Sequence, residues 1–379
     1  PSVFEDIIAL LAMYRPGPLG SGMVDDFVDR KHKRKELAYP HPDLEPILRD
    51  TYGVFLYQEQ CMQTANVLAG FSMGQADRLR KAMAKKNPED MEALGKMFVK
   101  GAIERKVPEE QAKSIFELMA SFGEYGFNKS HSAAYAVVTY RTAYLKTHYP
   151  SEFMAAVLSS EINDTDKIAQ YIAECRTMGI QILPPDVNRG RKLFSVEDGN
   201  IRFGLVAIKG VGDAAIESAI ATRAASGPFK NFLDFTRRVD KKVLNSRVLE
   251  ALSKAGAFDG FGLKRSQLLA MASDALKRGQ LYQAEKQSGQ ATFFDLLSGD
   301  DESFGIDELP APEIPEINRR DLLTAEKEAL GFYFSGNPFA EVAPVGRLFS
   351  THSIRALLEA GDVDLARVTG ILTGVKKFT

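Results

Sequence analysis

The sequence predicts a mainly α-helical protein, and three observations support this fold class. Apolar residues recur three and four positions apart through most of the stretch before Pro184, as they do on the buried face of a helix. Pro184 and Pro185 then mark a change, because short β-branched runs flank the turn Asp198-Gly199-Asn200. Helical spacing resumes after Gly212. We therefore expect a large helical domain first and a second helical domain after it.

The composition limits the class of protein. The 379 residues are 45% hydrophobic, which is enough for two or three domain cores. No apolar run reaches the roughly 18 residues of a membrane-spanning helix. The first residues lack the basic start of a signal peptide and look like the middle of a helix, which suggests a fragment. Cys61 and Cys175 stand in apolar helical contexts, as free thiols of a cytoplasmic protein do. The net charge of −2 does not by itself indicate a nucleic-acid partner.

No catalytic or metal-binding set can be assembled from the sequence. A two-metal site needs carboxylates held together on rigid strands. The acidic pairs Asp25-Asp26 and Asp300-Asp301 lie instead in helical or linker contexts. The five histidines are scattered singly and no cysteine pair accompanies them, so no zinc site is expected. We expect this chain to contribute no catalytic residue and to bind no metal.

A basic stripe is predicted on a helix that begins at the capping-box pattern Ser72-x-x-Gln75. Ala76, Leu79 and Met83 recur on the face that we expect to be buried. The cations on the other faces are Arg78, Arg80, Lys81, Lys85 and Lys86. Only Asp77 offsets them. This density of positive charge favours phosphate binding over an ordinary solvated face.

A second polar stretch runs from a loop at Gly123 and Gly126 into a helix that ends before Pro150. The first polar residues are Asn128, Lys129, Ser130 and His131. The apolar face expected for the helix consists of Ala133, Val137, Tyr140 and Tyr144. Ser130 or Ser132 can cap the helix start, where unpaired backbone N–H groups favour an anion. The stretch is therefore either a phosphate site or a solvated polar loop that leads into a core helix.

A hairpin is expected at Lys209, Gly210, Val211 and Gly212, which follow an apolar segment and precede a helix. The glycines allow close backbone approach and can direct N–H groups at a phosphate. This pattern resembles a helix-hairpin-helix motif, which holds the DNA backbone without reading bases. A second, less regular copy is expected over residues 243–259.

A docking peptide is expected at Gln290-Ala291-Thr292-Phe293-Phe294. A glutamine followed by paired aromatics is a typical anchor for a partner's pocket. The alternative is that Phe293 and Phe294 pack within their own domain. Residues 298–317 are acidic and contain prolines, so we expect a linker that leaves the peptide accessible. Residues 367–377 alternate in polarity, as the first strand of a further domain does.

Six stretches resemble the alpha subunits of bacterial DNA polymerase III, the C-family replicative polymerases. They are Tyr14–Leu19 (YRPGPL), Thr51–Met62 (TYGVFLYQEQCM), Leu79–Lys86 (LRKAMAKK), Phe127–Tyr135 (FNKSHSAAY), Ala207–Gly212 (AIKGVG) and Ala255–Asp259 (AGAFD). Each is weak alone, and their order and spacing make the match specific. The resemblance implies a fingers domain at 1–188 and a tandem helix-hairpin-helix, sliding-clamp-binding domain at 189–345. The start of an oligonucleotide-binding (OB) fold would follow at 346–379.

The resemblance also implies roles for the residues named above. Nucleotide binding is implied for Arg80, Lys81, Lys85, Asn128, Lys129, Ser130 and His131. DNA binding is implied for Lys209, Gly210, Val211 and Gly212, and clamp binding for Gln290, Phe293 and Phe294. Family members often have arginine at both of the first two positions, so Lys81 departs from the family pattern.

The function that the resemblance implies is that of part of a replicative DNA-directed DNA polymerase. Its partners would be primer–template DNA, deoxynucleoside triphosphates, the sliding clamp (beta subunit) and other subunits of the replicase. The catalytic aspartates and their Mg²⁺ would belong to a palm domain that precedes this fragment. The fragment alone is therefore expected to be inactive.

Two rival functions use the same features. A non-enzymatic adaptor would bind DNA and dock on a clamp, and residues 78–86 would then be only a solvated face. A helix-hairpin-helix DNA glycosylase would need a catalytic Lys or Asp in a base-flipping pocket. No such pattern surrounds Asp213 or Asp234, which are the acids available after the first hairpin.

Overall fold

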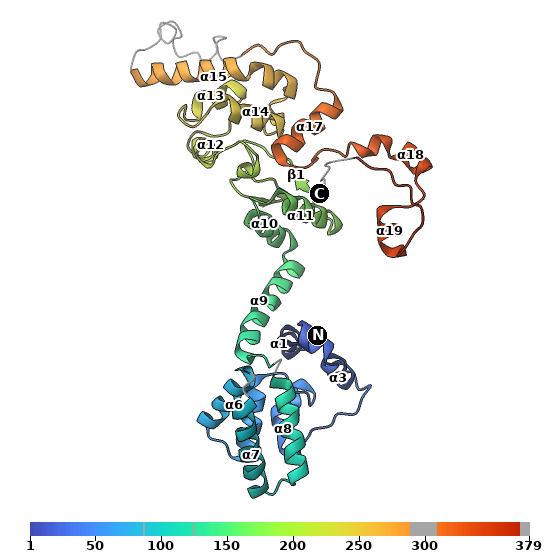
Figure 1. Ribbon diagram of the computed structural model, residues 1–379. Coiled ribbons are helices and arrows are strands. Elements are labelled where there is room, and N and C mark those ends of the chain that lie inside the picture. Colours follow the sequence, from blue (N-terminus) through green and yellow to red (C-terminus); the bar gives the residue numbers. More distant parts are fainter. Residues whose placement is uncertain (86–87, 124–125, 289–308, 372–379) are drawn as a thin grey trace. The chain divides into compact units, whose positions relative to one another are not determined.

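The computed structural model describes residues 1–85, 88–123, 126–288 and 309–371 and confirms a mainly α-helical protein (Figure 1). The chain forms two compact units, Pro1–His148 and Tyr149–Thr379. Separate clusters of buried apolar side chains hold each unit together. The strands of the described residues are three short ones in the second unit.

The first unit is helical. Its α-helices are α1 (Phe4–Met13), α2 (Pro16–Gly20), α3 (Met23–Lys31), α4 (Glu45–Leu48), α5 (Gln58–Ala69), α6 (Met73–Lys85), α7 (Pro88–Glu104), α8 (Glu109–Gly123) and α9 (Lys129–His148). The 3-10 turns η1 (Pro42–Leu44) and η2 (Arg49–Thr51) flank α4. Pro16 and Pro88 each stand at the first helical position, where the missing N–H of proline costs no hydrogen bond.

Two clusters of buried side chains form the core of the first unit. The larger cluster joins α5, α6, α7 and α8 and includes Phe71 and the fully buried Phe98. The smaller cluster joins α1, α3 and the first turns of α9 and includes Phe27 and Tyr57. A parallel β-bridge pairs Tyr57 with Phe127, so the chain entering α5 lies beside the chain entering α9. This bridge fixes the position of the polar residues at the start of α9.

The face of α9 that was predicted to be apolar is largely exposed and not buried. Ser132 and Ala136 are the buried residues of this helix. Tyr140 and Tyr144 are 52% and 47% exposed, although Tyr140 meets the ring of Phe4 edge-on at 6.1 Å. The spacing of apolar residues indicated the helix itself correctly. It could not indicate which face has a packing partner, because that depends on residues far away in the chain.

The second unit contains most of the remaining elements. Its α-helices are α10 (Pro150–Ser160), α11 (Thr165–Thr177), α12 (Asp213–Ser226), α13 (Phe232–Arg238), α14 (Ser246–Lys254), α15 (Arg265–Ser288), α17 (Arg319–Leu330), α18 (Phe339–Phe349) and α19 (Ile354–Ala360). Its strands are β1 (Ile182–Leu183), β2 (Ser195–Glu197) and β3 (Asn200–Arg202), and its 3-10 turns are η3 (Leu205–Ala207) and η4 (Asp259–Phe261).

The three strands form one small sheet in the order β1-β3-β2. β2 and β3 make the hairpin expected around residues 198–200, with Val196 opposite Ile201. β1 runs parallel to β3, with Ile182 beside Ile201. Parallel pairing joins segments that no tight turn connects, so local patterns in the sequence do not reveal it.

The core of the second unit spans the domain boundary that we expected at residue 188. Leu158 of α10 and Ile172 of α11 are buried in the same cluster as Phe203 and Phe258. The compact unit accordingly begins at Tyr149. The change in composition at Pro184 marks the entry into the small sheet and not the edge of a core.

The acidic stretch that was expected to be a linker is described from residue 309 onward. Leu309 and Ala311 pack against the core of the second unit. The Glu316 carboxylate accepts hydrogen bonds from the backbone N–H groups of Arg265 (3.0 Å) and Ser266 (3.1 Å) at the start of α15. Residues 309–317 are therefore held against the domain by a helix cap, which an unattached linker would not be.

The strand expected over 367–377 is described only as far as residue 371. Residues 367–371 form no strand, and the remainder lies outside the described residues. Within 346–371 the regular structure consists of the end of α18 and of α19. The start of an OB-fold at 346–379 stays a prediction.

Candidate nucleotide and DNA interface

The helix α6 carries the predicted basic stripe. Its buried residues include Ala76, Leu79 and Met83, which is the face that the sequence indicated. Lys81 lies on the opposite side and its side chain is 62% exposed, whereas Arg80 borders the buried face and its side chain is 33% exposed. Burial of the apolar face therefore sets the direction in which these cations point.

Asp77 pairs with two of the predicted nucleotide-binding cations. Its Oδ1 accepts from Arg80 Nε (3.0 Å) and Nη2 (2.8 Å), and its Oδ2 lies 2.8 Å from Lys81 Nζ. The hydrogen bonds from Lys81 and then from Arg80 lower the pKa of the Asp77 carboxyl. No acidic partner of Lys85 occurs among the described residues. The stripe thus keeps a surplus of positive charge and includes one carboxylate that a ligand would have to displace.

The start of α9 is capped by residues that the sequence had not assigned to this role. Asn128 Oδ1 accepts from the backbone N–H of His131 (2.9 Å) and from the hydroxyl of Ser130. The Glu59 carboxylate accepts from the backbone N–H of Lys129 (3.0 and 3.1 Å). The prediction that Ser130 or Ser132 caps this helix is therefore wrong. Asn128 is the better cap because its side-chain oxygen reaches the N–H three residues on.

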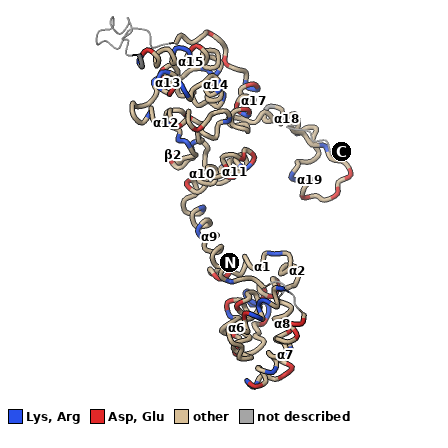
Figure 2. Tube along the Cα trace, turned by 60° about the vertical axis from the view of Figure 1, so that its left-hand side comes forward, with Lys and Arg blue, Asp and Glu red and all other residues tan. Residues whose placement is uncertain are grey.

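The capped terminus changes what residues 128–131 can offer an anion. Two of the backbone N–H groups that would attract a phosphate already bind Asn128 and Glu59. The side chains of Lys129 and His131 are among the groups that remain. Lys129 Nζ lies 3.7 Å from Asp50 Oδ2, and the His131 ring lies against Tyr135 at 4.7 Å between centroids. α9 contains no acidic residue along its 20 residues, so no carboxylate of its own opposes an anion there (Figure 2).

A residue that sequence reasoning did not place at this loop is Arg15. Its guanidinium lies 4.4 Å from the centroid of the Phe127 ring, directly before the predicted residues 128–131. Burial lowers the pKa of this guanidinium. No spacing rule could have found Arg15, because it is far from Phe127 in the sequence and only the packing of α1 and α9 brings the two together.

α5 is the common neighbour of the two predicted clusters. Gln58 Nε2 donates to the carbonyl of Gly126 (3.1 Å), and Glu59 holds the start of α9. α6 packs against α5 in the larger core of the unit. Among the described residues, no hydrogen bond or ion pair joins Arg80, Lys81 or Lys85 directly to residues 128–131. The structure therefore places the clusters on one support and does not join them into a closed pocket.

The hairpin at 209–212 is a tight turn ahead of α12. Val211 N–H donates to Ile208 O (3.2 Å), and Gly210 adopts a φ of +85°, a conformation that a residue with a Cβ rarely takes. Val211 is buried, and Gly212 stands at the N-cap of α12. Lys209 N–H donates to Ala329 O (2.7 Å), which fixes the turn against the end of α17. In the first turn of α12, Ala215 N–H already donates to Gly212 O (3.1 Å), so a phosphate there would meet only the N–H groups that precede Ala215.

In the second hairpin copy, expected over 243–259, a side chain covers the backbone of the turn. A Cβ on Gly256 would overlap the guanidinium of Arg265. That guanidinium binds Asp259 (2.7 Å) and Glu326 (3.0 Å), and Glu326 is buried. The backbone at Gly256 is therefore covered from this side by an ion network.

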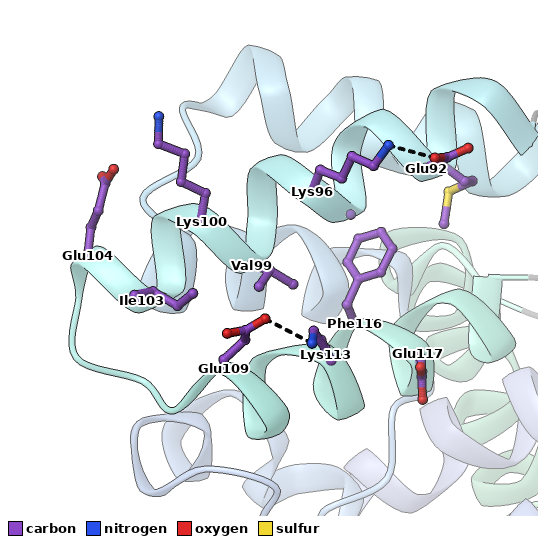
Figure 3. A pocket seen from close by; sticks show the side chains of 12 residues that line it. Glu92, Lys96, Val99, Lys100, Ile103, Glu104, Glu109, Lys113, Phe116 and Glu117 are labelled. Carbon is purple, nitrogen blue, oxygen red and sulfur yellow. Dashed lines mark hydrogen bonds and ion pairs between the residues drawn. The ribbon is translucent and has the colours of Figure 1, made fainter.

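A groove of about 580 Å³ lies between α7 and α8 in the first unit (Figure 3). Val99, Ile103 and Phe116 line it, and the ion pairs Lys96–Glu92 (2.7 Å) and Lys113–Glu109 (2.8 Å) stand along its rim. None of the residues predicted for nucleotide binding lines this groove. This groove is thus separate from the residues predicted to bind nucleotide.

The clamp residues Gln290, Phe293 and Phe294 lie outside the described residues. In the part of the chain that is described, no group of three or more His, Cys, Asp or Glu is arranged to hold a metal ion. No described helix is both long enough and apolar enough to cross a bilayer. The two cysteines of the chain, Cys61 and Cys175, are both buried and form no disulfide.

Comparison with known families accounts for both units. Residues 1–106 match the bacterial DNA polymerase III alpha subunit finger domain, and residues 179–268 match a helix-hairpin-helix motif. The fold and these matches define a mainly helical chain with a polymerase finger domain followed by a helix-hairpin-helix domain. The chain belongs to the family of bacterial DNA polymerase III alpha subunits.

Several curated relatives support this assignment. The chain is 46% identical to DNA polymerase III subunit alpha of Pasteurella multocida over 98% of its own length and 32% of the relative. The corresponding values are 47%, 89% and 29% for Escherichia coli K12, and 43%, 99% and 34% for Pseudomonas aeruginosa. The chain therefore spans about a third of the length of the relatives it matches.

Proposed function

We propose that this chain supplies nucleotide and DNA binding to a replicative DNA-directed DNA polymerase. In this proposal the cations of α6 and residues 128–131 hold the triphosphate of an incoming deoxynucleotide. The hairpin at 209–212 holds the backbone of duplex DNA, and the peptide from Gln290 to Phe294 binds a sliding clamp. Tethering to a clamp would raise the effective concentration of the enzyme at its primer. The observation that carries the nucleotide part is the exposed basic stripe of α6 within a matched finger domain.

The energetics favour exchange of Asp77 for a phosphate. Exposed ion pairs such as Lys81–Asp77 are screened by solvent and contribute little to stability, so breaking them costs little. Hydrogen bonds to a charged partner contribute roughly 1.5–3 kcal/mol each, and a triphosphate offers several acceptors. The planar guanidinium of Arg80 can donate two of them together, whereas Lys81 provides a point charge. The present pairing with Asp77 would then preset the direction of both side chains.

The contribution to the reaction would be positioning and charge. The described residues offer no group of carboxylates that fits Mg²⁺. The cations of α6 would neutralise the triphosphate as charge shifts onto the leaving oxygens, which is how phosphoryl-type transfers are commonly accelerated. No proton transfer is assigned to these residues.

The test is a double substitution in the polymerase that carries this chain. Arg80→Gln with Lys81→Gln should raise the KM for deoxynucleotides by about 10-fold or more, because two charged hydrogen-bond donors are lost. The affinity for primer–template DNA should change much less. Lys96→Gln with Lys100→Gln on α7 is the matched control, since it removes two exposed cations from the groove that no prediction connects with nucleotide.

An unchanged KM in the Arg80/Lys81 variant would reject the nucleotide role of α6. That result would favour a DNA-binding and clamp-docking adaptor, for which α6 is only a solvated face. The pairing of both cations with Asp77 is the observation that keeps this second candidate in view.

A further inference from the structure

A polar cavity of about 300 Å³ lies in the second unit between α12, α13 and α15. Three cations line it, namely Arg237, Arg238 and Lys286. The other polar groups at its wall include the hydroxyls of Ser226 and Tyr282. No carboxylate is among its lining residues. This cavity lies outside both the predicted nucleotide site and the hairpin at 209–212.

Arg238 forms a rigid wall of the cavity. Its guanidinium donates to Asp234 Oδ2 (2.9 Å), to Gly227 O (2.7 Å) and to Thr222 O (3.3 Å), and it stacks on the Phe229 ring at 4.7 Å. Its Nε atom is buried and meets no acceptor among the described residues. The carbonyl oxygens at the end of α12 would otherwise repel an anion, and Arg238 neutralises them.

The opposite wall is set by α15. The Arg237 guanidinium lies 5.1 Å from the centroid of the Tyr282 ring. Gln283 Nε2 donates to Thr236 O (3.2 Å) and Val239 O (2.7 Å), which ties the end of α13 to α15. These contacts hold the cavity in shape without a ligand, so little conformational entropy would be lost when an anion binds. Lys286, one turn beyond Tyr282, is exposed at the mouth of the cavity.

We infer that this cavity binds one phosphate group of a nucleic-acid backbone. Positive charge, hydroxyl donors and the absence of a lining carboxylate are the features that a phosphodiester selects. The inference rests on the proposed DNA binding of the same unit. The hairpin lies at the start of α12 and the cavity at its end, which for 14 residues is about 21 Å apart. That length corresponds to roughly six nucleotides of one DNA strand, so one short duplex can reach both contacts.

The experiment compares two single substitutions on α15 in the whole 379-residue chain. Lys286→Gln removes the cation at the mouth of the cavity, and Lys277→Gln removes an exposed cation of the same helix outside it. Affinity for a short duplex oligonucleotide is measured from about 50 to 200 mM salt. Loss of one phosphate contact should reduce the slope of log affinity against log salt by about 1. The difference in affinity between wild type and Lys286→Gln should therefore shrink about 3-fold across this range, and Lys277→Gln should keep the wild-type slope.

A second arm replaces the duplex by inorganic tripolyphosphate. Two outcomes would reject the cavity as a contact to the DNA backbone while leaving DNA binding by the unit intact. In the first, the slope of log affinity against log salt is the same for wild type and Lys286→Gln. In the second, Lys277→Gln lowers this slope as much as Lys286→Gln does. If the chain binds tripolyphosphate in a way that depends on Lys286 but does not bind the duplex, both the proposed DNA binding and the assignment of DNA as the ligand of the cavity are rejected. Absence of binding to both probes rejects the cavity as a phosphate site.

Discussion

Asp6 shows how one carboxylate ties separate parts of the first unit together. This side chain of α1 is buried, and its Oδ2 accepts from Ser2 N–H (2.6 Å), Val3 N–H (3.1 Å) and Lys31 Nζ (2.7 Å). Burial acts to raise the pKa of the carboxyl. The hydrogen bonds from Lys31, Ser2 and Val3, with the charge of Lys31, outweigh burial and lower the pKa to about 2.

Stability should therefore depend on Asp6 in acid. Because the pKa is about 2 in the folded state against 3.8 for the ordinary group, the folded form binds fewer protons. The contribution, about 2 kcal/mol, is complete above about pH 4 and is lost as the pH falls toward 2. Asp6→Asn should lower the free energy of unfolding of the first unit by about this amount at neutral pH. The difference from wild type should vanish in acid.

Urea unfolding at a series of pH values measures this difference. Asp25→Asn, which removes an exposed carboxylate of α3, is the control and should change the acid dependence little. A constant difference between wild type and Asp6→Asn down to pH 2 would contradict the assigned pKa.

Residue roles were the hardest part of the site to predict from the sequence. Gln58, Glu59 and Gln60 are three adjacent polar residues, and all three bind other parts of the protein. Gln60 is buried and accepts from Leu56 N–H (2.8 Å) and Tyr57 N–H (2.9 Å). Glu59 caps a helix that begins 70 residues later. A polar side chain shows its chemistry in the sequence, but its partner is set by tertiary contacts.

At the scale of elements, α7 packs closely on α5 because Gly101 has no side chain. A Cβ at this position would overlap the carbonyl oxygen of Ala69, a backbone atom that cannot move aside cheaply. Gly101→Ala should therefore lower the free energy of unfolding of the first unit by about 1–3 kcal/mol, the usual cost of overpacking.

The matched control is Gly74→Ala in α6. A Cβ at Gly74 would meet nothing within 4 Å. Alanine should therefore raise the free energy of unfolding by about 0.4–1 kcal/mol, because it lowers the conformational entropy of the unfolded chain. Chemical denaturation of both variants gives the two free energies. Equal effects of the same sign would show that the α5–α7 contact is not as close as described.

Helices were predicted well because their signals are local. The capping box Ser72-x-x-Gln75 forms, with Ser72 N–H donating to Gln75 Oε1 (2.8 Å) and Gln75 N–H to Ser72 Oγ (3.3 Å). The buried faces were predicted less evenly. The apolar face of α6 is buried, whereas that of α9 is largely exposed. Apolar residues recur at helical spacing in both helices, but in α9 they also stand on the other faces, so the spacing alone does not select one buried face.

At the scale of the whole molecule, the two units have separate cores and should unfold separately. Phe98 belongs to the core of the first unit and Phe258 to that of the second. Calorimetry should therefore resolve more than one transition. Phe98→Ala should lower the midpoint of one transition and Phe258→Ala that of another, since each change removes about 3–5 kcal/mol from its own core.

The two substitutions serve as controls for each other. A single cooperative transition that both variants shift equally would mean that the cores are coupled. The separation itself could not be located from the sequence. The change of texture at Pro184 is local, whereas a core boundary depends on which distant residues pack together, as Leu158 and Phe258 do in one cluster.

The ion network around Arg265 extends beyond the segment that matches the helix-hairpin-helix family. The helix-hairpin-helix match ends at residue 268, but the guanidinium that closes its second half is held by Glu326 of α17. The segment that matches the family, residues 179–268, is thus shorter than the segment through α17 that supplies both acidic partners of Arg265. A lineage that moved residues 179–268 alone into another gene would carry Arg265 with Asp259 but without Glu326, the second of its two acidic partners. A transferred segment that extended through α17 would keep both acidic partners of Arg265.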